Sequence, residues 1–193
     1  MKTHHLDIGC GAKPRNPYNR DCLWGVDIAA DPDCPVAQII QCNVALEALP
    51  FADDFFDSVS AYDFMEHLPR SVVLDGGMFF PFVHVMNEIY RVLKPNGLLY
   101  ACTPAFPRQE AFVDPTHTNF ITVKTHEFFT APQYLARIYG YTGTFYAERV
   151  EWVRPIRDYE PVRLSFGQRF NDIKDGIKKK KSHLLWEFRK MSV

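Results

Sequence analysis

The chain has 193 residues, of which 47% are hydrophobic and 15% aromatic. This is enough apolar surface for one folded domain without disulfide or metal staples, and it excludes a disordered chain. The 22 basic and 23 acidic residues give a formal net charge of -1. That balance disfavours a nucleic-acid-binding protein, whose affinity comes mainly from neutralising phosphates.

The spacing of the cysteines and the lengths of the apolar runs indicate the cellular compartment of the protein. The five cysteines contain no C-x-x-C pair, so we expect no disulfide framework, no metal site and a reducing, cytoplasmic location. The N-terminal residues lack the apolar segment of a signal peptide, and no apolar run is long enough for a spanning helix. We therefore expect no association with a membrane.

Short apolar runs alternate with polar connections through the first half of the chain. They predict buried strands at residues 4–8, 24–28, 39–42, 56–61 and 98–103. From Phe82 to Leu93, apolar residues recur at three- and four-residue spacing and stop before Pro95 and Gly97, which indicates an amphipathic helix. The alternation predicts an α/β fold with a mainly parallel sheet.

The second half is expected to add a helix and a strand pair. Thr130–Gln133 resembles a capping box, opening a helix that ends at Gly140. Residues 144–153 and 163–166 are expected to pair as antiparallel strands. We expect one domain over residues 1–170 and a basic amphipathic tail helix over residues 171–193. The run Lys178–Lys181 is read as a solvated helix face, with a binding surface as the alternative.

Polar and glycine residues follow each expected strand. Asp7 to Gly11 form a glycine-bearing turn after the first strand, and Asp27 ends the second. Ligands of parallel sheets bind beyond these carboxyl ends, and glycine lets the backbone approach them closely. Pro14 occupies the place of the third glycine of a dinucleotide fingerprint, which weakens a pyrophosphate cradle and favours a nucleoside ligand without phosphates.

Several blocks in the same order resemble the motifs of class I S-adenosylmethionine-dependent methyltransferases, particularly the branch that acts on small molecules. They span about residues 4 to 103 and comprise Leu6–Gly11, Gly25–Ile28, Leu49–Phe51 with Phe56 and Asp57, Glu66–Leu68, and Glu88–Gly97. The resemblance implies a Rossmann-like, mostly parallel sheet of seven strands with an antiparallel last strand and helices on both faces. It also implies S-adenosylmethionine as the cofactor.

The resemblance also assigns cofactor contacts. Asp7 brings negative charge near the cationic methionine end, and the remaining contacts would come from Gly9, Cys10, Gly11, Asp27, Ile28, Asn43, Val44 and Tyr62. In this assignment Asp27 accepts from the ribose hydroxyls and Tyr62 lies near the sulfonium. Asn43 replaces the acid that usually contacts adenine, and its side-chain oxygen can still accept from the adenine amino group.

Two histidines are candidates for the general base. His67 follows the fourth strand and His117 lies in the polar segment after the fifth, and either imidazole could take a proton from an acceptor hydroxyl. A structural role is the alternative for both. The acceptor is expected to be a small molecule or glycan. The alternatives are a non-catalytic S-adenosylmethionine-binding partner subunit and an NAD-dependent oxidoreductase. The sequence does not indicate an oligomeric state.

Overall fold

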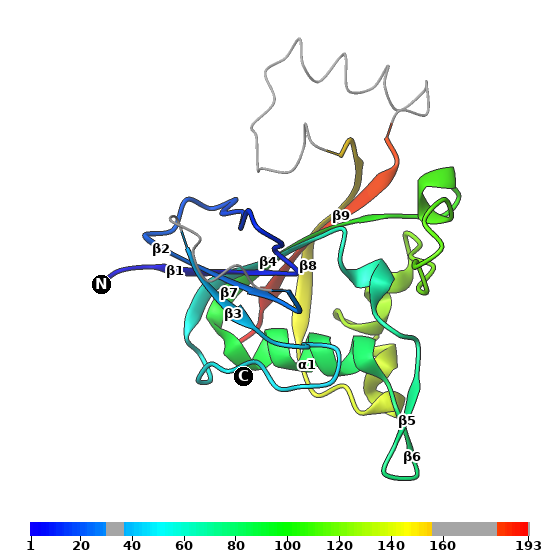
Figure 1. Ribbon diagram of the computed structural model, residues 1–193, viewed down its shortest axis with the longest axis horizontal. Coiled ribbons are helices and arrows are strands. Elements are labelled where there is room, and N and C mark those ends of the chain that lie inside the picture. Colours follow the sequence, from blue (N-terminus) through cyan, green and yellow to red (C-terminus); the bar gives the residue numbers. More distant parts are fainter. Residues whose placement is uncertain (30–36, 156–180, 193) are drawn as a thin grey trace.

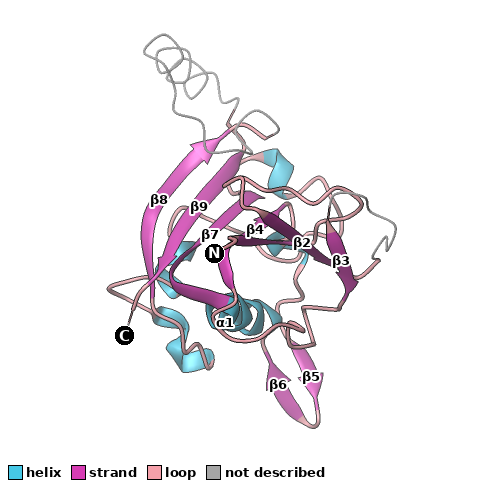
Figure 2. Cartoon of the chain, turned by 90° about the vertical axis from the view of Figure 1, so that its left-hand side faces the viewer, coloured by secondary structure: helices cyan, strands magenta, loops and turns pink. Residues whose placement is uncertain are grey.

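The structure is a computed structural model that describes residues 1–29, 37–155 and 181–192. Seven strands form one twisted sheet in the order β3-β2-β1-β4-β7-β9-β8 (Figures 1 and 2). Their bounds are β1 His4–Ile8, β2 Cys22–Asp27, β3 Gln38–Gln41, β4 Phe56–Tyr62, β7 Leu93–Pro104, β8 Phe145–Val153 and β9 His183–Lys190. The strands from β3 to β7 pair in parallel, whereas β9 is antiparallel to both neighbours. The predicted α/β sheet with an antiparallel last strand is confirmed.

The described residues contain one α-helix, α1 (Pro81–Val92), whose first turn opens on proline, a residue that suits this position. A β5–β6 hairpin (Val72–Leu74 and Gly77–Phe79) precedes it and projects from the body (Figure 1). Short 3-10 helices occur at η1 Met65–His67, η2 Gln109–Ala111, η3 Thr125–Phe128 and η4 Leu135–Tyr139. The helix expected from Thr130 is therefore only the short η4, although it ends at Gly140 as predicted, with φ of 87°.

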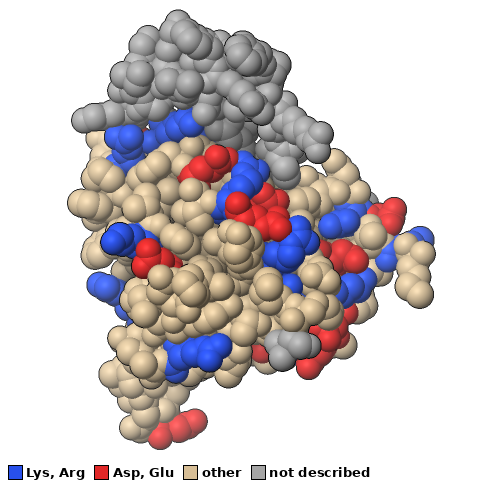
Figure 3. Space-filling model, turned by 180° about the vertical axis from the view of Figure 1, so that it is seen from behind, with Lys and Arg blue, Asp and Glu red and all other residues tan. Residues whose placement is uncertain are grey.

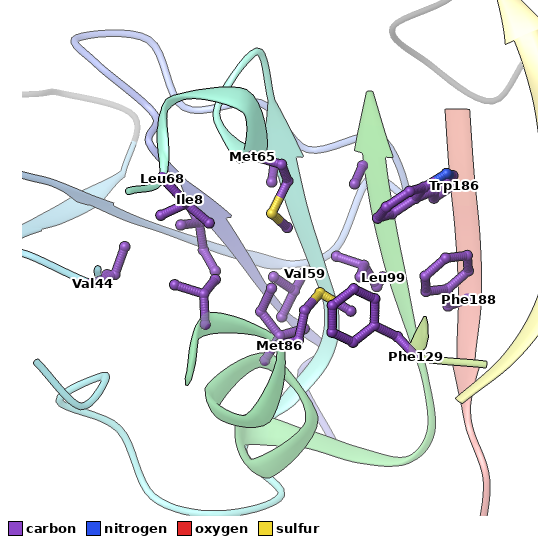
Figure 4. Close-up of a cluster of buried hydrophobic side chains, with 14 of the residues drawn as sticks. Ile8, Val44, Val59, Met65, Leu68, Met86, Leu99, Phe129, Trp186 and Phe188 are labelled. Atoms are coloured by element: carbon purple, nitrogen blue, oxygen red, sulfur yellow. The ribbon is translucent and has the colours of Figure 1, made fainter. Parts of the chain in front are cut away.

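The main core lies between α1 and one face of the sheet. Side chains alternate along a strand, so Leu6 and Ile8 of β1 share this face with Val59 of β4. Ile89 and Met86 of α1 pack against them and are fully buried. Figure 4 shows the core continuing from Val44, Ile8 and Leu68 to Phe129, Trp186 and Phe188.

The opposite face of the sheet is polar, although much of it is buried. His5 and Asp7 of β1 and Ser58 and Ser60 of β4 point to this face and are at most 1% exposed. Parallel sheets usually bury apolar side chains on both faces because helices cover both. Here residues 9–21 form no helix, and their loop covers part of the face through Tyr18, whose ring lies against Tyr100. The expectation of helices on both faces is thus not met in the described residues, since α1 lies on the other side.

The C-terminal segment corrects another expectation. Residues 183–190 were predicted as part of a tail helix, but they form β9, a strand inside the sheet. Trp186 and Phe188 point into the core, and Leu185 lies on the other face. The strand is buried on both faces, so its apolar residues run nearly continuously and imitate a helix pattern. Residues 163–166 and most of Lys178–Lys181 lie outside the described residues.

The described surface agrees with the nearly equal numbers of basic and acidic residues in the sequence. On the face shown in Figure 3, basic and acidic side chains of the described residues are interspersed. No described helix is long and apolar enough to cross a membrane. Among the described residues, Cys22 and Cys42 are free thiols.

Candidate cofactor cavity and reaction site

A cavity of about 500 Å³ opens beyond the carboxyl ends of the parallel strands. The predicted cofactor residues that line it are Gly9, Asp27, Ile28, Asn43 and Val44. Much of its wall is apolar: Ile28 is 65% exposed and Leu46 is 43% exposed, although both side chains are hydrophobic. An open apolar cleft with a few polar groups at its edge is typical of a small-ligand site.

The glycine turn brings the backbone to the cavity wall. Gly9 has φ of 65°, a conformation that favours glycine, and a Cβ there would lie 2.4 Å from the Phe64 ring. Phe64 also lines the cavity, so Gly9 lets this ring close against the turn. Gly11 has φ of 53°, but a Cβ added there would meet nothing within 4 Å, and the residue does not line the cavity. The two glycines therefore serve different purposes.

Asp27 joins the end of β2 to the glycine turn. Its Oδ2 accepts a hydrogen bond of 2.8 Å from the Gly11 amide, and its Oδ1 accepts one of 2.9 Å from the Ala29 amide. Each carboxylate oxygen has a second lone pair that remains suited to a hydroxyl donor. Asp27 can thus fix the turn and still face a ligand in the cavity.

Asn43 and Val44 form the beginning of the turn after β3. The Asn43 carbonyl accepts hydrogen bonds of 2.9 Å from the amides of Leu46 and Glu47, which folds this segment along the cavity edge. Val44 and Leu68 belong both to the core and to the cavity wall, and Figure 4 shows both. The cavity floor is therefore continuous with the core.

The other predicted cofactor residues do not line the cavity. Cys10 is 8% exposed and packs over Gly25, where an added Cβ would lie 2.6 Å from its sulfur. Tyr62 is buried on the polar face, with the Arg15 guanidinium 4.6 Å from the centre of its ring. The following residue, Asp63, lines the cavity instead. Sequence reasoning did not single out Asp63, because strand alternation alone does not show where a strand ends.

Asp7 belongs to a directed chain of hydrogen bonds on the polar face. Arg20 Nε donates to Ser58 Oγ over 3.3 Å, and Ser58 Oγ lies 2.8 Å from His5 Nδ1. His5 Nε2 lies 2.8 Å from Ser60 Oγ, which donates to Asp7 Oδ1 over 2.5 Å. Because Ser60 gives its proton to the carboxylate, it accepts from His5 Nε2–H. The chain therefore ends on the acid that precedes the glycine turn.

Burial shifts the pKa values of two members of this chain, His5 and Asp7. Desolvation, helped by the Arg20 charge, lowers the pKa of His5 to about 3. Desolvation raises the pKa of Asp7 to about 7, against hydrogen bonds from Ser60 and from the Arg15 amide that favour the charged form. His5 is thus neutral near neutral pH, whereas Asp7 is poised between its two forms.

The two candidate bases, which are distant in sequence, lie side by side. The amides of Thr118 and Asn119 donate to the Glu66 carbonyl over 2.8 and 3.0 Å, which docks this loop on η1. As a result the rings of His67 and His117 lie 4.7 Å apart and nearly perpendicular. His67 lines the cavity, whereas the His117 side chain is 8% exposed.

The neighbours of these imidazoles fix which ring nitrogen carries the proton. His67 Nδ1 lies 2.9 Å from Thr116 Oγ1, which already donates to Asp114 over 2.7 Å, so Nδ1–H must be the donor. His117 Nδ1 lies 3.2 Å from the Ala111 carbonyl, which can only accept. In the neutral form of both rings, Nε2 therefore carries a free lone pair.

Glu66 completes this group and was not singled out as a functional residue from the sequence. Its side chain is 1% exposed, and its Oε1 lies 4.0 Å from His117 Nε2. Burial raises the pKa of this carboxyl to about 7. The sequence offered one indication that Glu66 is functional, namely its position directly before His67 in the Glu66–Leu68 block. Nothing in that spacing reveals that His117 lies beside it.

Comparison with known families identifies the class of protein. Residues 6–101 match a family model described as a methyltransferase domain. This range holds the glycine turn, the carboxyl ends of β1, β2, β3 and β4, and η1. The match and the fold are those of a class I S-adenosylmethionine-dependent methyltransferase domain, and S-adenosylmethionine is the cofactor that they imply.

The chain is also similar in fold to solved structures. The [4+2]-cyclase SpnF is 16% identical with a TM-score of 0.60, and the match covers 100% of this chain and 76% of that one. A chain of the Haloferax volcanii complex that contains the Trm112 methyltransferase activator is 15% identical with a TM-score of 0.59, covering 100% and 84%. An S-adenosylmethionine-dependent methyltransferase from Archaeoglobus fulgidus is 17% identical with a TM-score of 0.57, covering 98% and 86%. Comparison with curated protein sequences gives no match.

Proposed function

We propose that the chain transfers a methyl group from S-adenosylmethionine to a hydroxyl oxygen of a small molecule or glycan. The observation that carries the proposal is that His67 lines the same cavity as Gly9 and Asp27, with His117 against it. A cavity that places a proton-accepting pair beside the cofactor residues suits an acceptor that must lose a proton.

The cofactor would lie along the strand ends. The ribose hydroxyls would donate to Asp27, and adenine would lie against Ile28 and Val44 with its amino group toward Asn43. Four predicted contacts would act without touching the ligand, by supporting the glycine turn and setting the charge beside it. They are Asp7, Cys10, Gly11 and Tyr62. This division is a refinement of the predicted contacts.

The chemistry requires alignment and one proton transfer. S-adenosylmethionine, held by Gly9, Asp27 and Val44, would supply a methyl group on a good leaving group. The chain's own residues would align the acceptor hydroxyl with this methyl group and take the proton that the hydroxyl loses. The Nε2 lone pair of His67 is the base nearest the cavity, and His117 is the alternative. Asp114 holds the His67 tautomer through Thr116.

Transfer of a labelled methyl group tests this proposal. The full chain is incubated with methyl-labelled S-adenosylmethionine and a panel of hydroxylated small molecules and glycans, and labelled product is measured. With an acceptor found, His67→Ala or His117→Ala should lower turnover by about 10²–10⁴-fold while the cofactor still binds. His126→Ala, in η3 and outside the cavity wall, is the matched control. Full turnover in both test variants would overturn the assignment of the base.

Two other functions make different predictions. The fold alone does not determine the reaction, and one structural neighbour is described as a [4+2]-cyclase. A non-catalytic partner subunit would bind the cofactor without labelling any acceptor. An NAD-dependent oxidoreductase would need a pyrophosphate site, but residues 9–21 form no helix, and Pro14 packs against β2, 3.2 Å from the Cβ position of Gly25. We expect the protein to act in the cytoplasm, in keeping with the free thiols of Cys22 and Cys42.

A further inference from the structure

Glu66, His67 and His117 bring three potential metal ligands together at the rim of the cavity. One ligand atom from each lies within 4.8 Å of the others. We propose that these residues bind one divalent transition-metal ion, of which Zn²⁺ fits best. This departs from the expectation of no metal site, which rested on cysteine spacing. It goes beyond the proposed methyl transfer, because the binding requires neither the cofactor nor an acceptor.

An unsatisfied buried oxygen is the second observation. Thr103 Oγ1 donates to Glu66 Oε2 over 2.8 Å, but Oε1 has no hydrogen-bond partner among the described residues. The Glu66 side chain is 1% exposed, so water does not compensate freely for the missing partner. Leaving a buried charged acceptor unpaired is costly. A cation between Oε1 and the two imidazoles would satisfy this atom.

The outer neighbours are those of a metal site. Histidine ligands usually donate their other ring N–H to a carbonyl or carboxylate, which orients the ring and raises its basicity. His117 donates Nδ1–H to the Ala111 carbonyl, and His67 donates Nδ1–H to Thr116, which in turn donates to Asp114. The Nε2 lone pairs of both rings are therefore available to a metal ion.

The distances and the ligand types select the ion. Zinc bonds of about 2.0–2.2 Å in tetrahedral geometry place ligand atoms about 3.4 Å apart. Glu66 Oε1 and His117 Nε2 lie 4.0 Å apart, and the three ligand atoms lie within 4.8 Å of one another. Small side-chain rotations would close this gap. Two imidazoles and one carboxylate suit zinc and its first-row neighbours, whereas Mg²⁺ and Ca²⁺ prefer oxygen ligands. Three protein ligands leave a fourth position open, as in catalytic zinc sites.

His67, the exposed residue of the three, faces the cofactor cavity, so a bound ion could take part in the reaction there. His67 lines the cavity, while Glu66 is buried behind it. At its open coordination position the ion would bind an acceptor hydroxyl and lower the pKa of that hydroxyl, which eases loss of the proton. Metal binding occupies both Nε2 lone pairs, so the imidazoles then act as ligands and not as bases. Loss of activity in His67 and His117 variants fits both roles, and metal binding separates them.

Metal titration without cofactor tests the inference. The full chain is stripped with a chelator and titrated with Co²⁺, whose visible absorption reports a four-coordinate site, and then with Zn²⁺ as competitor. We expect one saturable site per chain, displacement of cobalt by zinc, and a zinc-dependent rise in Tm. Glu66→Gln and His117→Ala should weaken zinc binding by at least about 100-fold, and Thr116→Val by about 10–100-fold through the outer neighbour.

Matched controls separate a metal site from misfolding and from surface binding. His84→Ala on α1 and His126→Ala on η3 remove histidines outside the cluster and should leave zinc affinity unchanged. Metal-free circular dichroism and Tm identify any variant that fails to fold, and Glu66→Gln preserves the shape of the side chain. Absence of a saturable site, or equal zinc affinity in wild type and in folded Glu66→Gln and His117→Ala, would overturn the inference. Separate titration with S-adenosylmethionine shows whether the proposed methyl transfer fails independently.

Discussion

His5 and Asp7 point to the same face of β1 and are joined through one hydroxyl, since Ser60 Oγ lies 2.8 Å from His5 Nε2 and donates to Asp7 Oδ1 over 2.5 Å. Burial moves their pKa values in opposite directions, to about 3 for His5 and about 7 for Asp7. The acid behind the glycine turn is therefore coupled to a polar network that extends to Arg20. This network, the glycine turn and the last strands each have consequences that can be measured.

The Asp7 and His5 shifts predict opposing effects of pH on the free energy of unfolding. Between about pH 4 and 7 the folded state keeps an Asp7 proton that the unfolded chain has lost, so Asp7 lowers stability as pH rises. Between about pH 3 and 6.5 the unfolded chain binds a His5 proton that the folded state does not, so His5 raises stability as pH rises. In wild type the two slopes partly cancel.

Single variants should reveal each slope in denaturant titrations without cofactor. Asp7→Asn should make the slope of stability against pH more positive than in wild type, by up to about 1.4 kcal/mol per pH unit between pH 4 and 7. His5→Gln should shift the slope in the negative direction below about pH 6.5. Parallel curves for wild type and both variants would show that these groups titrate alike in the folded and unfolded states.

The two turn glycines should respond differently to alanine. Gly9→Ala adds a Cβ 2.4 Å from Phe64 at a positive φ, so the ring must move and the cavity changes. We expect its affinity for S-adenosylmethionine to fall at least about tenfold, or about 1.4 kcal/mol. Gly11→Ala meets nothing within 4 Å, so it should cost about 1–2 kcal/mol of stability with much less effect on affinity. Calorimetric titration and thermal unfolding measure both, and equal losses of affinity would show that Gly9 has no special place at the cavity wall.

Asp27 should carry the recognition of the ribose. Asp27→Ala removes the carboxylate that lines the cavity and holds the Gly11 amide. We expect a loss of about 2–3 kcal/mol in binding of S-adenosylhomocysteine, as for a hydrogen bond to a charged group.

The 2′-deoxy form of S-adenosylhomocysteine separates the two roles of Asp27. Wild type should bind this form more weakly than the parent compound, whereas Asp27→Ala should distinguish the two poorly. An unchanged preference in the variant would show that another residue contacts this hydroxyl.

The C-terminal strand should be essential for stability. Phe188 is fully buried and stacks on Trp186 with ring centres 5.2 Å apart. Phe188→Ala should lower the free energy of unfolding by about 3–5 kcal/mol. Tyr146→Ala on β8, where the side chain is 51% exposed, is the control and should change stability by about 0.5 kcal/mol or less. A similar small effect for Phe188→Ala would contradict its place in the core.

The sheet could be predicted because each parallel strand has a recognisable local sequence pattern. Each strand from His4 to Thr103 is a short run with several apolar residues and has a polar or glycine residue at or just after its end, and the helix before Leu93 has a clear period. The last strand could not be predicted in this way. Leu184, Trp186 and Phe188 are buried on one face of the sheet and Leu185 on the other, and such a nearly continuous apolar run matches a helix as well as a strand.

The site could be predicted where the chain itself sets the position of a residue. Gly9, Asp27 and Asn43 each lie at or just after the end of a strand, and strand ends converge on one edge of the sheet. The approach of His117 to Glu66 depends on hydrogen bonds from Thr118 and Asn119 to a carbonyl that no sequence motif marks. That long-range contact, and the burial that leaves Glu66 Oε1 unpaired, can be found only in the folded chain.

The central claim is that the cavity between Gly9, Asp27 and Val44 holds S-adenosylmethionine. Calorimetric titration of the purified full chain with S-adenosylmethionine, S-adenosylhomocysteine and NAD tests it most directly. We expect both sulfur compounds to bind at one site per chain, with no measurable binding of NAD. Binding of NAD without either sulfur compound would contradict this claim.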